Sequence, residues 1–165
     1  MSFKWRWLRF RAKMLREKQP PEFIARGWAI GMFYGCTIPF GFQLILSIPT
    51  AFLLKGSKIG ATLGTFITNH FTIFVIYPVQ CWLGNAVLSA MGASVTPVSR
   101  IVDELMRIGS MSMVSGEFWR ALCSLGGDVM AAFFIGGAIF AVVMTPITYF
   151  GVRRMVIARR ARRAA

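Results

Sequence analysis

Acidic residues are scarce in this chain of 165 residues, which contains six Asp and Glu against 19 Lys and Arg. All six acids lie outside the long apolar runs, so a carboxylate proton relay inside a membrane is not expected. The chain has one histidine, which excludes metal sites built from several histidines. The sequence contains no recognisable nucleophile with an acid–base partner. We therefore expect no metal, no cofactor and no enzymatic activity.

Cysteine and charge are also sparse. The three cysteines, Cys36, Cys81 and Cys123, are far apart and lack any metal-ligand spacing. Charged residues make up 15% of the chain, against roughly 25% in an ordinary soluble domain. Hydrophobic residues make up 56%, and the chain has 15 Phe and 16 Gly. This composition favours lipid over water as the main surroundings of the protein.

The basic residues concentrate at the two ends of the chain. Eight of the 19 lie at or before Arg26, six lie at or after Arg153, and the apolar middle holds five. Basic flanks around apolar segments are typical of membrane proteins whose basic ends stay cytoplasmic and face anionic lipids. We therefore expect a membrane protein with both termini in the cytoplasm, with membrane lipids as partners and without nucleic-acid binding.

Two basic segments are candidates for contact with lipid headgroups. Residues 1–19 alternate aromatic or aliphatic residues with Arg and Lys, which predicts a helix lying in the headgroup region. A disordered basic tail is the alternative interpretation of this segment. Residues 153–165 form the second segment, a basic cytoplasmic tail. The candidate headgroup contacts are Arg6, Arg9, Lys13, Arg153 and Arg154.

The membrane domain is expected to cover residues 20–152, and its first apolar segment is interrupted. From 27 to 54 no residue is charged, but Pro39 and Gly41 stand in the middle. A run of about 28 residues is too long for one straight crossing, which needs about 20, and too short for two comfortable ones. We predict a re-entrant helical hairpin whose tip is covered by protein or water. Two thin, tilted crossings are the alternative.

A second interruption divides the apolar segment 59–90. Thr68 to Thr72 form a polar cluster at its centre, so we predict a broken transmembrane segment. The polar side chains at the two breaks either contact a polar headgroup or satisfy backbone groups freed by the breaks, and the second interpretation is the more ordinary one. The candidate substrate-binding or pore residues are Pro39, Gly41, Gln43, Asn69, His70 and Thr72.

The remaining segments complete an all-α, multi-pass membrane fold. Residues 91–128 repeat apolar side chains at helical spacing and are expected to form an amphipathic external connection. Residues 129–152 are free of charge and long enough to be a transmembrane helix. A hairpin, one crossing within 59–90 and a return at 129–152 place both basic ends on one side. Small residues that favour close helix packing are Gly60, Gly64, Gly136 and Gly137.

The stretch RGWAIGMFYGCTIPFGFQLILSIPTAFLLKGSKIGATLGTFITNHFTIFVIYPVQCWLG resembles the bacterial integral-membrane family known as domain of unknown function 2062. The resemblance covers residues 20–90 and extends loosely to 152. Family members usually carry Pro after the Asn, where this chain has His70. The resemblance implies a small inner-membrane protein, in some cases encoded beside or fused to glycosyltransferases or other envelope enzymes, without an established activity. The matching residues are Gly31, Gly35, Pro39, Gly41, Gln43, Gly64, Thr65, Asn69 and Thr72.

Two functional hypotheses fit these observations. The first is a small transporter or flippase-like unit that handles a lipid-linked or envelope substrate. It rests on the paired breaks and on Asn69, His70 and Thr72. One chain has few helices with which to enclose a cavity, so we expect a homo-oligomer or a subunit of a larger membrane complex. The second hypothesis is a structural or accessory subunit that packs through its glycine-rich faces.

Overall fold

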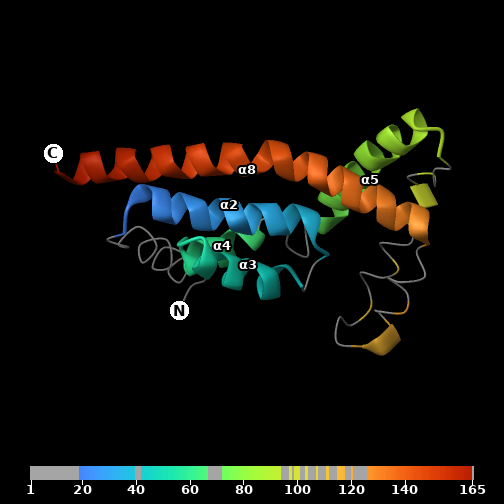
Figure 1. Ribbon diagram of the computed structural model, residues 1–165, viewed down its shortest axis with the longest axis horizontal. Helices are drawn as coiled ribbons and strands as arrows, with labels where there is room; N and C mark the ends of the chain where they lie inside the picture. The colour runs from blue at the N-terminus through green and yellow to red at the C-terminus, as the bar shows by residue number, and fades with distance from the viewer. Residues whose placement is uncertain are drawn as a thin grey trace.

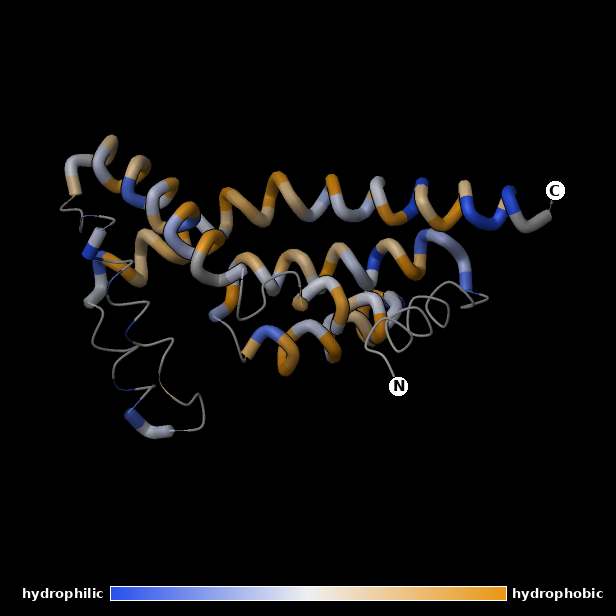
Figure 2. The backbone as a smooth tube through the Cα atoms, turned by 180° about the vertical axis from the view of Figure 1, so that it is seen from behind, coloured by the Kyte–Doolittle hydropathy of each residue, from blue (hydrophilic) through white to orange (hydrophobic). Residues whose placement is uncertain are grey.

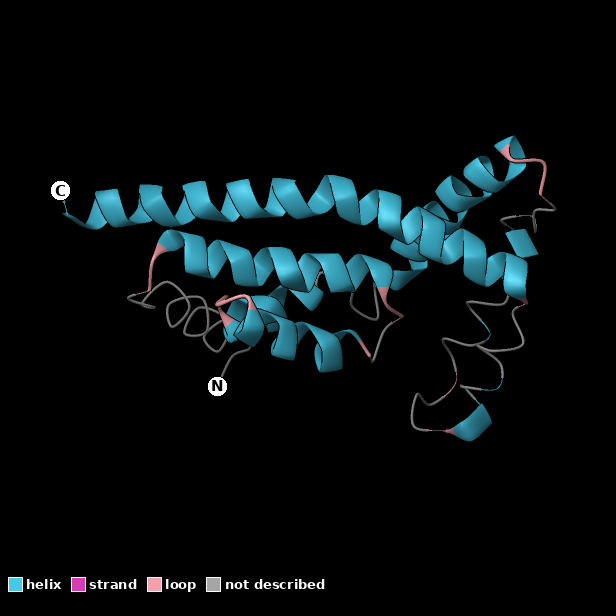
Figure 3. Cartoon of the chain, viewed as in Figure 1, coloured by secondary structure: helices cyan, strands magenta, loops and turns pink. Residues whose placement is uncertain are grey.

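A computed structural model describes residues 19–39, 42–66, 72–93 and 126–164, with isolated positions between 97 and 120. Within these ranges the chain is all-helical, which confirms the predicted fold class for this part (Figure 3). Segment 1–19 lies almost entirely outside the described residues, as does most of 91–128. The helices are α2 (Pro21–Thr37), α3 (Gln43–Leu53), α4 (Lys58–Thr65), α5 (Ile73–Ala90) and α8 (Gly127–Ala164).

Two prolines set the limits of α2. Pro20 precedes the helix and Pro21 occupies its first turn, where a missing N–H costs no hydrogen bond. At the other end, Ile38 is extended, with φ −113° and ψ 135°, because the ring of Pro39 disfavours a helical residue before it. The helix therefore stops at Thr37, and α3 starts beyond the interruption that the sequence predicts.

A tight turn separates α3 from α4. Lys55 has a positive φ of 50°, and the N–H of Gly56 donates to the Ala51 carbonyl at 2.7 Å. Ser57 then caps α4, because its hydroxyl accepts a hydrogen bond from the N–H of Gly60 at 3.0 Å. These bonds fold the two short helices back on each other.

The longest helix is α8, with 38 residues. It is the helix among the described ones that is long and apolar enough to cross a membrane, over Gly127–Arg162. The predicted transmembrane segment, 129–152, lies within this helix, which continues through the predicted basic tail to Ala164. The reason is local, since the last ten residues are mainly Arg and Ala, which are good helix formers. The multi-pass arrangement and the re-entrant hairpin remain predictions.

Helix α8 runs along the length of the molecule, and the other helices pack beneath or across it (Figure 1). Its C-terminal half lies against α2, with Val152 and Val156 packed on Ile24. Its N-terminal part packs against α5, where Tyr77 meets Phe133 with ring centroids 4.8 Å apart. On the other side of α2 lie α4 and α3.

The interior combines apolar side chains with several polar ones, and many large apolar side chains lie outside. The largest fully buried side chains are Gln80, Thr65, Cys36, Cys81, Ser47 and Ser57. By contrast, Leu53 is 75% exposed and Val142 is 71% exposed. The hydrophobic colour runs along the outside of α3 and α8, whereas the hydrophilic colour gathers at the C-terminal end of α8 (Figure 2). A contiguous apolar surface of this kind marks contact with lipid or with another protein.

Candidate functional site at the helix breaks

Each of the two interruptions, 38–42 and 66–72, lies between two helices along the chain, and we call their described residues (38, 39, 42, 66 and 72) the break region. Helices α2 and α4 run in the same direction, because Gly27 lies against Ser57 and Gly31 lies against Gly64. Helix α3 returns antiparallel to α4 through the turn at Lys55. The C-terminal ends of α2 and α4 therefore lie on the same side of the molecule as the first turn of α3.

Three polar side chains are buried beside the break region. Gln43, the first residue of α3, is 3% exposed, and Ser47 and Thr65 are 0% and 1% exposed. The Thr65 hydroxyl donates to the Thr62 carbonyl at 2.7 Å. Buried polar groups cost free energy unless they are hydrogen-bonded, so this concentration is an unusual feature of an otherwise apolar bundle.

The end of α2 is held by Gln80, a residue of α5 that is 0% exposed. Its Nε2 donates to the Cys36 carbonyl at 3.0 Å. The last carbonyls of a helix lack intrahelical partners, and Pro39 has no N–H to offer, so a side chain from another helix takes this role. The Oε1 of Gln80 is buried and has no hydrogen-bond partner among the residues that the structure describes.

Glycines of α8 allow this junction to form. A side chain at Gly137 would lie 2.6 Å from the Cys36 carbonyl oxygen, and one at Gly136 would overlap the backbone of Gln80. The α2, α5 and α8 backbones therefore approach closely around the Gln80–Cys36 hydrogen bond. Close backbone approach through small residues is a typical way to pack helices within a membrane.

Comparison with known proteins identifies the family. The family described as "Uncharacterized protein conserved in bacteria (DUF2062)" matches residues 5–165. The chain belongs to this family. The resemblance inferred from the sequence, over residues 20–90 and loosely to 152, is thereby confirmed, and the match extends over nearly the whole chain. No curated protein and no solved structure matches the chain.

The structure places three of the predicted site residues of this DUF2062 chain. Pro39 is half-buried after the end of α2, and Gln43 is buried at the start of α3, so both flank the first interruption. Thr72 is half-buried before α5, and its carbonyl accepts the N–H of Val75 at 3.1 Å. Gly41, Asn69 and His70 lie outside the described residues.

Sequence reasoning missed Gln80, which holds the end of α2, as well as Ser47 and Thr65 beside the break. A signal for Gln80 was present, because it is a strongly polar residue two positions after Pro78 in an uncharged apolar run. Polar residues within such runs are costly and face the protein interior. The same rule, applied to every polar residue of the apolar segments, would have identified all three.

Of the predicted headgroup contacts, the described Arg153 pairs with the first turn of α2, at the opposite end of that helix from the break region. Arg153 Nε donates to Glu22 Oε1 at 2.9 Å, and Arg154 is exposed. The pKa of Glu22 lies below its ordinary value of 4.5, first because of a hydrogen bond from its own backbone N–H and second because of Arg153. Arg6, Arg9 and Lys13 lie outside the described residues. Among the described residues, no group of His, Cys, Asp and Glu could hold a metal ion.

Proposed function

We propose that this DUF2062 protein is a multi-pass protein of the bacterial inner membrane that binds the polar part of a lipid-linked or envelope substrate at its break region. The observation that carries the proposal is the presence of buried polar side chains beneath an apolar outer surface. Gln43, Ser47 and Gln80 lie inside the bundle, while the outside of α3, α5 and α8 is apolar. An interior of this kind suits a protein that is surrounded by acyl chains and handles a polar group.

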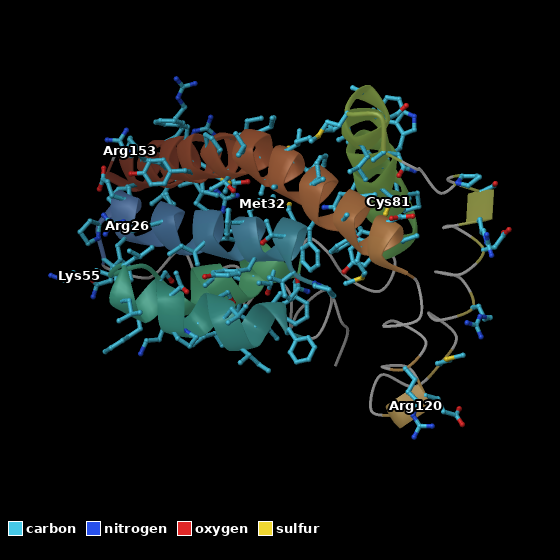
Figure 4. All side chains as sticks on the ribbon, turned by 45° about the vertical axis from the view of Figure 1, so that its right-hand side comes forward. Arg26, Met32, Lys55, Cys81, Arg120 and Arg153 are labelled. Atoms are coloured by element: carbon cyan, nitrogen blue, oxygen red, sulfur yellow. The ribbon has the colours of Figure 1, made fainter. Side chains whose placement is uncertain are left out.

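Helix lengths support a position of the break region near the middle of the membrane. The basic end of the bundle, with Arg26, Lys55 and Arg153, marks the cytoplasmic headgroup level in this proposal (Figure 4). From that level, α3 with 11 residues rises about 16 Å and α4 with eight residues rises about 12 Å. A hydrocarbon core is about 30 Å thick, so both helices end roughly halfway across it.

The electrostatics of the helix ends support polar recognition at this depth. The N-terminus of α3 carries a partial positive charge, and the C-termini of α2 and α4 carry partial negative charges. Broken helices in transporters bind substrates in this way, with helix termini pointing at a site near the midplane. The Oε1 of Gln80 adds a buried acceptor at the end of α2. A polar headgroup with both donors and acceptors would find partners there.

The test is a translocation assay. The purified chain is reconstituted into liposomes that contain a fluorescent lipid, and the rate at which the label becomes accessible to a quencher from outside is measured. We expect transfer above protein-free liposomes and a loss of about tenfold in Gln43→Leu, which removes a polar contact from the break region. Ile45→Leu is the matched control, because Ile45 is 64% exposed on the same helix.

An accessory subunit is the second candidate function, favoured by the extent of the exposed apolar surface. Trp82 is 59% exposed on α5 and Phe150 is 57% exposed on α8, and a larger membrane complex would cover such side chains. If the reconstituted chain is inert and purifies from native membranes with a fixed partner, this function replaces the first. Transfer by the chain alone, lost in Gln43→Leu, supports the first.

A further inference from the structure

The turn between α3 and α4 gathers three cationic side chains at one place. Lys55 and Lys58 belong to the turn and its continuation, and both are exposed. Arg26 reaches it from α2, with Nη1 donating to the Leu54 carbonyl at 2.7 Å. Arg26 and Lys55 lie at the same end of the bundle (Figure 4). No acidic residue occurs between 51 and 60, so the turn itself supplies no counter-charge.

The backbone of this turn is held firmly against α2. The N–H of Ser57 donates to the Phe23 carbonyl at 3.0 Å, which is possible because Gly27 offers no side chain in the way. Together with the Arg26 contact to Leu54, this bond fixes the turn on the first half of α2. The cationic groups are therefore preorganised, which lowers the entropic cost of binding a ligand.

Glu22, the acidic residue described at this end of the molecule, already forms an ion pair away from the turn. Glu22 pairs with Arg153 at 2.9 Å, on the side of α2 that faces α8. The turn lies on the side of α2 that faces α4, so its positive charge stays available for an anion. Within a membrane, the phosphate monoanion of a lipid is the group that forms charge-assisted hydrogen bonds with clustered Lys and Arg side chains.

Apolar side chains flank the cations and identify the kind of anion. Phe52 is 66% exposed and Leu53 is 75% exposed immediately before Lys55, and Ile59 is 38% exposed after Lys58. The Nζ of Lys58 lies 4.7 Å from the centre of the Phe52 ring, so charge and apolar surface are in direct contact. A phospholipid offers the matching pair of features, a phosphate and an acyl chain.

We propose that Arg26, Lys55 and Lys58 form a site for the phosphate of an anionic phospholipid, whose acyl chain lies along Phe52 and Leu53. We call it the turn site, and it rests on the membrane placement proposed above. Three cations without a carboxylate favour a lipid with net negative charge over a zwitterionic one. Bound lipid fixes the α3–α4 hairpin at the headgroup level.

The test uses the full chain purified in a neutral detergent and stripped of lipid. Its thermal unfolding is followed by intrinsic fluorescence after addition of phosphatidylglycerol or phosphatidylcholine. At a lipid concentration near 100 times the Kd, we expect phosphatidylglycerol to raise the Tm by about 5 °C or more. Phosphatidylcholine should raise it by less than half of that.

Matched variants distinguish lipid binding at the turn site from nonspecific attraction between a basic protein and an anionic lipid. Lys55→Gln combined with Lys58→Gln should abolish the phosphatidylglycerol effect, and Lys55→Gln alone should reduce it if the double variant fails to fold. Arg159→Gln combined with Arg162→Gln removes the same charge from the far end of α8 and should leave the effect intact. Equal responses to both lipids, or equal losses in both double variants, would overturn the turn site. The Tm shift does not depend on translocation, so the absence of a shift would leave the proposed transfer activity separately testable. A chain that purifies without detergent would overturn the membrane placement itself.

Discussion

The two faces of α2 show two ways of packing helices. Toward α4 the contact is made by glycines, because a side chain at Gly31 would lie 2.7 Å from the Cα of Gly64. Toward the C-terminal half of α8 the contact is made by side chains, with Ile24 and Ala25 packed on Val152. Lipid tails are as apolar as these side chains, so burial of apolar area adds little stability within a membrane. In the membrane placement proposed above, dispersion contacts and close backbone approach supply the stability instead.

This difference predicts unequal tolerance of substitutions on the two faces. On the α4 face, the groups opposite each glycine are backbone atoms of another helix, which cannot rotate away. On the α8 face, side chains can change rotamer or leave a small void. Changes on the α4 face should therefore cost the most stability, changes at the Gln80 junction should cost less, and changes on the α8 face should cost the least of the three.

Gly31→Ala should cause the largest loss. The added methyl group would overlap the Ala61 carbonyl and the Gly64 backbone, so the helices must separate. We expect a loss of about 3 kcal/mol or more, measured as a fall in the apparent Tm in detergent. Gly151→Ala is the control, since no atom lies within 4 Å of a side chain there. A Gly31→Ala protein as stable as the control would contradict the close packing of α2 on α4.

Gln80→Leu should have the second largest effect. It keeps the approximate size of the side chain but leaves the Cys36 carbonyl buried without its donor. We expect a loss of about 1–3 kcal/mol in the free energy of unfolding. Ser89→Ala, at an exposed position on the same helix, should change the Tm little. Unchanged stability in Gln80→Leu would mean that the end of α2 does not depend on α5.

Val156→Ala tests the α8 face, where Val156 is 3% exposed against Ile24. Removal of two methyl groups leaves a small void, and we expect a cost of about 1 kcal/mol. The neighbouring Met155 is 43% exposed, so Met155→Ala should cost less. If Val156→Ala proved as damaging as Gly31→Ala, the contrast between the two faces of α2 would be wrong.

Acidification should have the smallest effect, through the Glu22–Arg153 pair that joins the ends of α2 and α8. The pKa of Glu22 is lowered in the folded protein, so its contribution is present above the ordinary value of 4.5 and is lost as the pH falls through the lower, folded value. A pH series of Tm values should show a slight fall in this acidic range. The fall in Tm should be smaller in Glu22→Gln. If the variant and the unmodified protein gave the same Tm values across the pH series, the fall could not be assigned to Glu22.

The sequence predicted the features that depend on local chemistry. The break after Thr37 follows from Pro39, and α8 follows from a long uncharged run. The close packing predicted for Gly64 and Gly137 agrees with the structure, where side chains at these positions would lie 2.5 Å from the Trp28 carbonyl and 2.6 Å from the Cys36 carbonyl. Such features are encoded within a few residues, so they can be recognised without knowledge of the fold.

The features that sequence reasoning missed depend on distant partners. The Gln80 side chain bonds a carbonyl 44 residues earlier in the chain, and no local pattern encodes that pairing. Gln43 was named as a candidate at the first break, but its sequence position did not reveal which residues would cover it. The candidate site residues therefore remain predictions, to which the structure adds Gln80, Ser47 and Thr65 as buried polar side chains.

The glycine contacts of α2 have a consequence for the genetics of this protein. A bulky substitution in an ordinary core can be compensated by a smaller side chain on the neighbouring helix. Opposite Gly31 stand the carbonyl of Ala61 and the Cα of Gly64, and no substitution makes a main chain smaller. Second-site suppressors of a lesion at Gly31 should therefore not arise at the facing positions. They should arise where the path of α4 can shift, in the turn that precedes it.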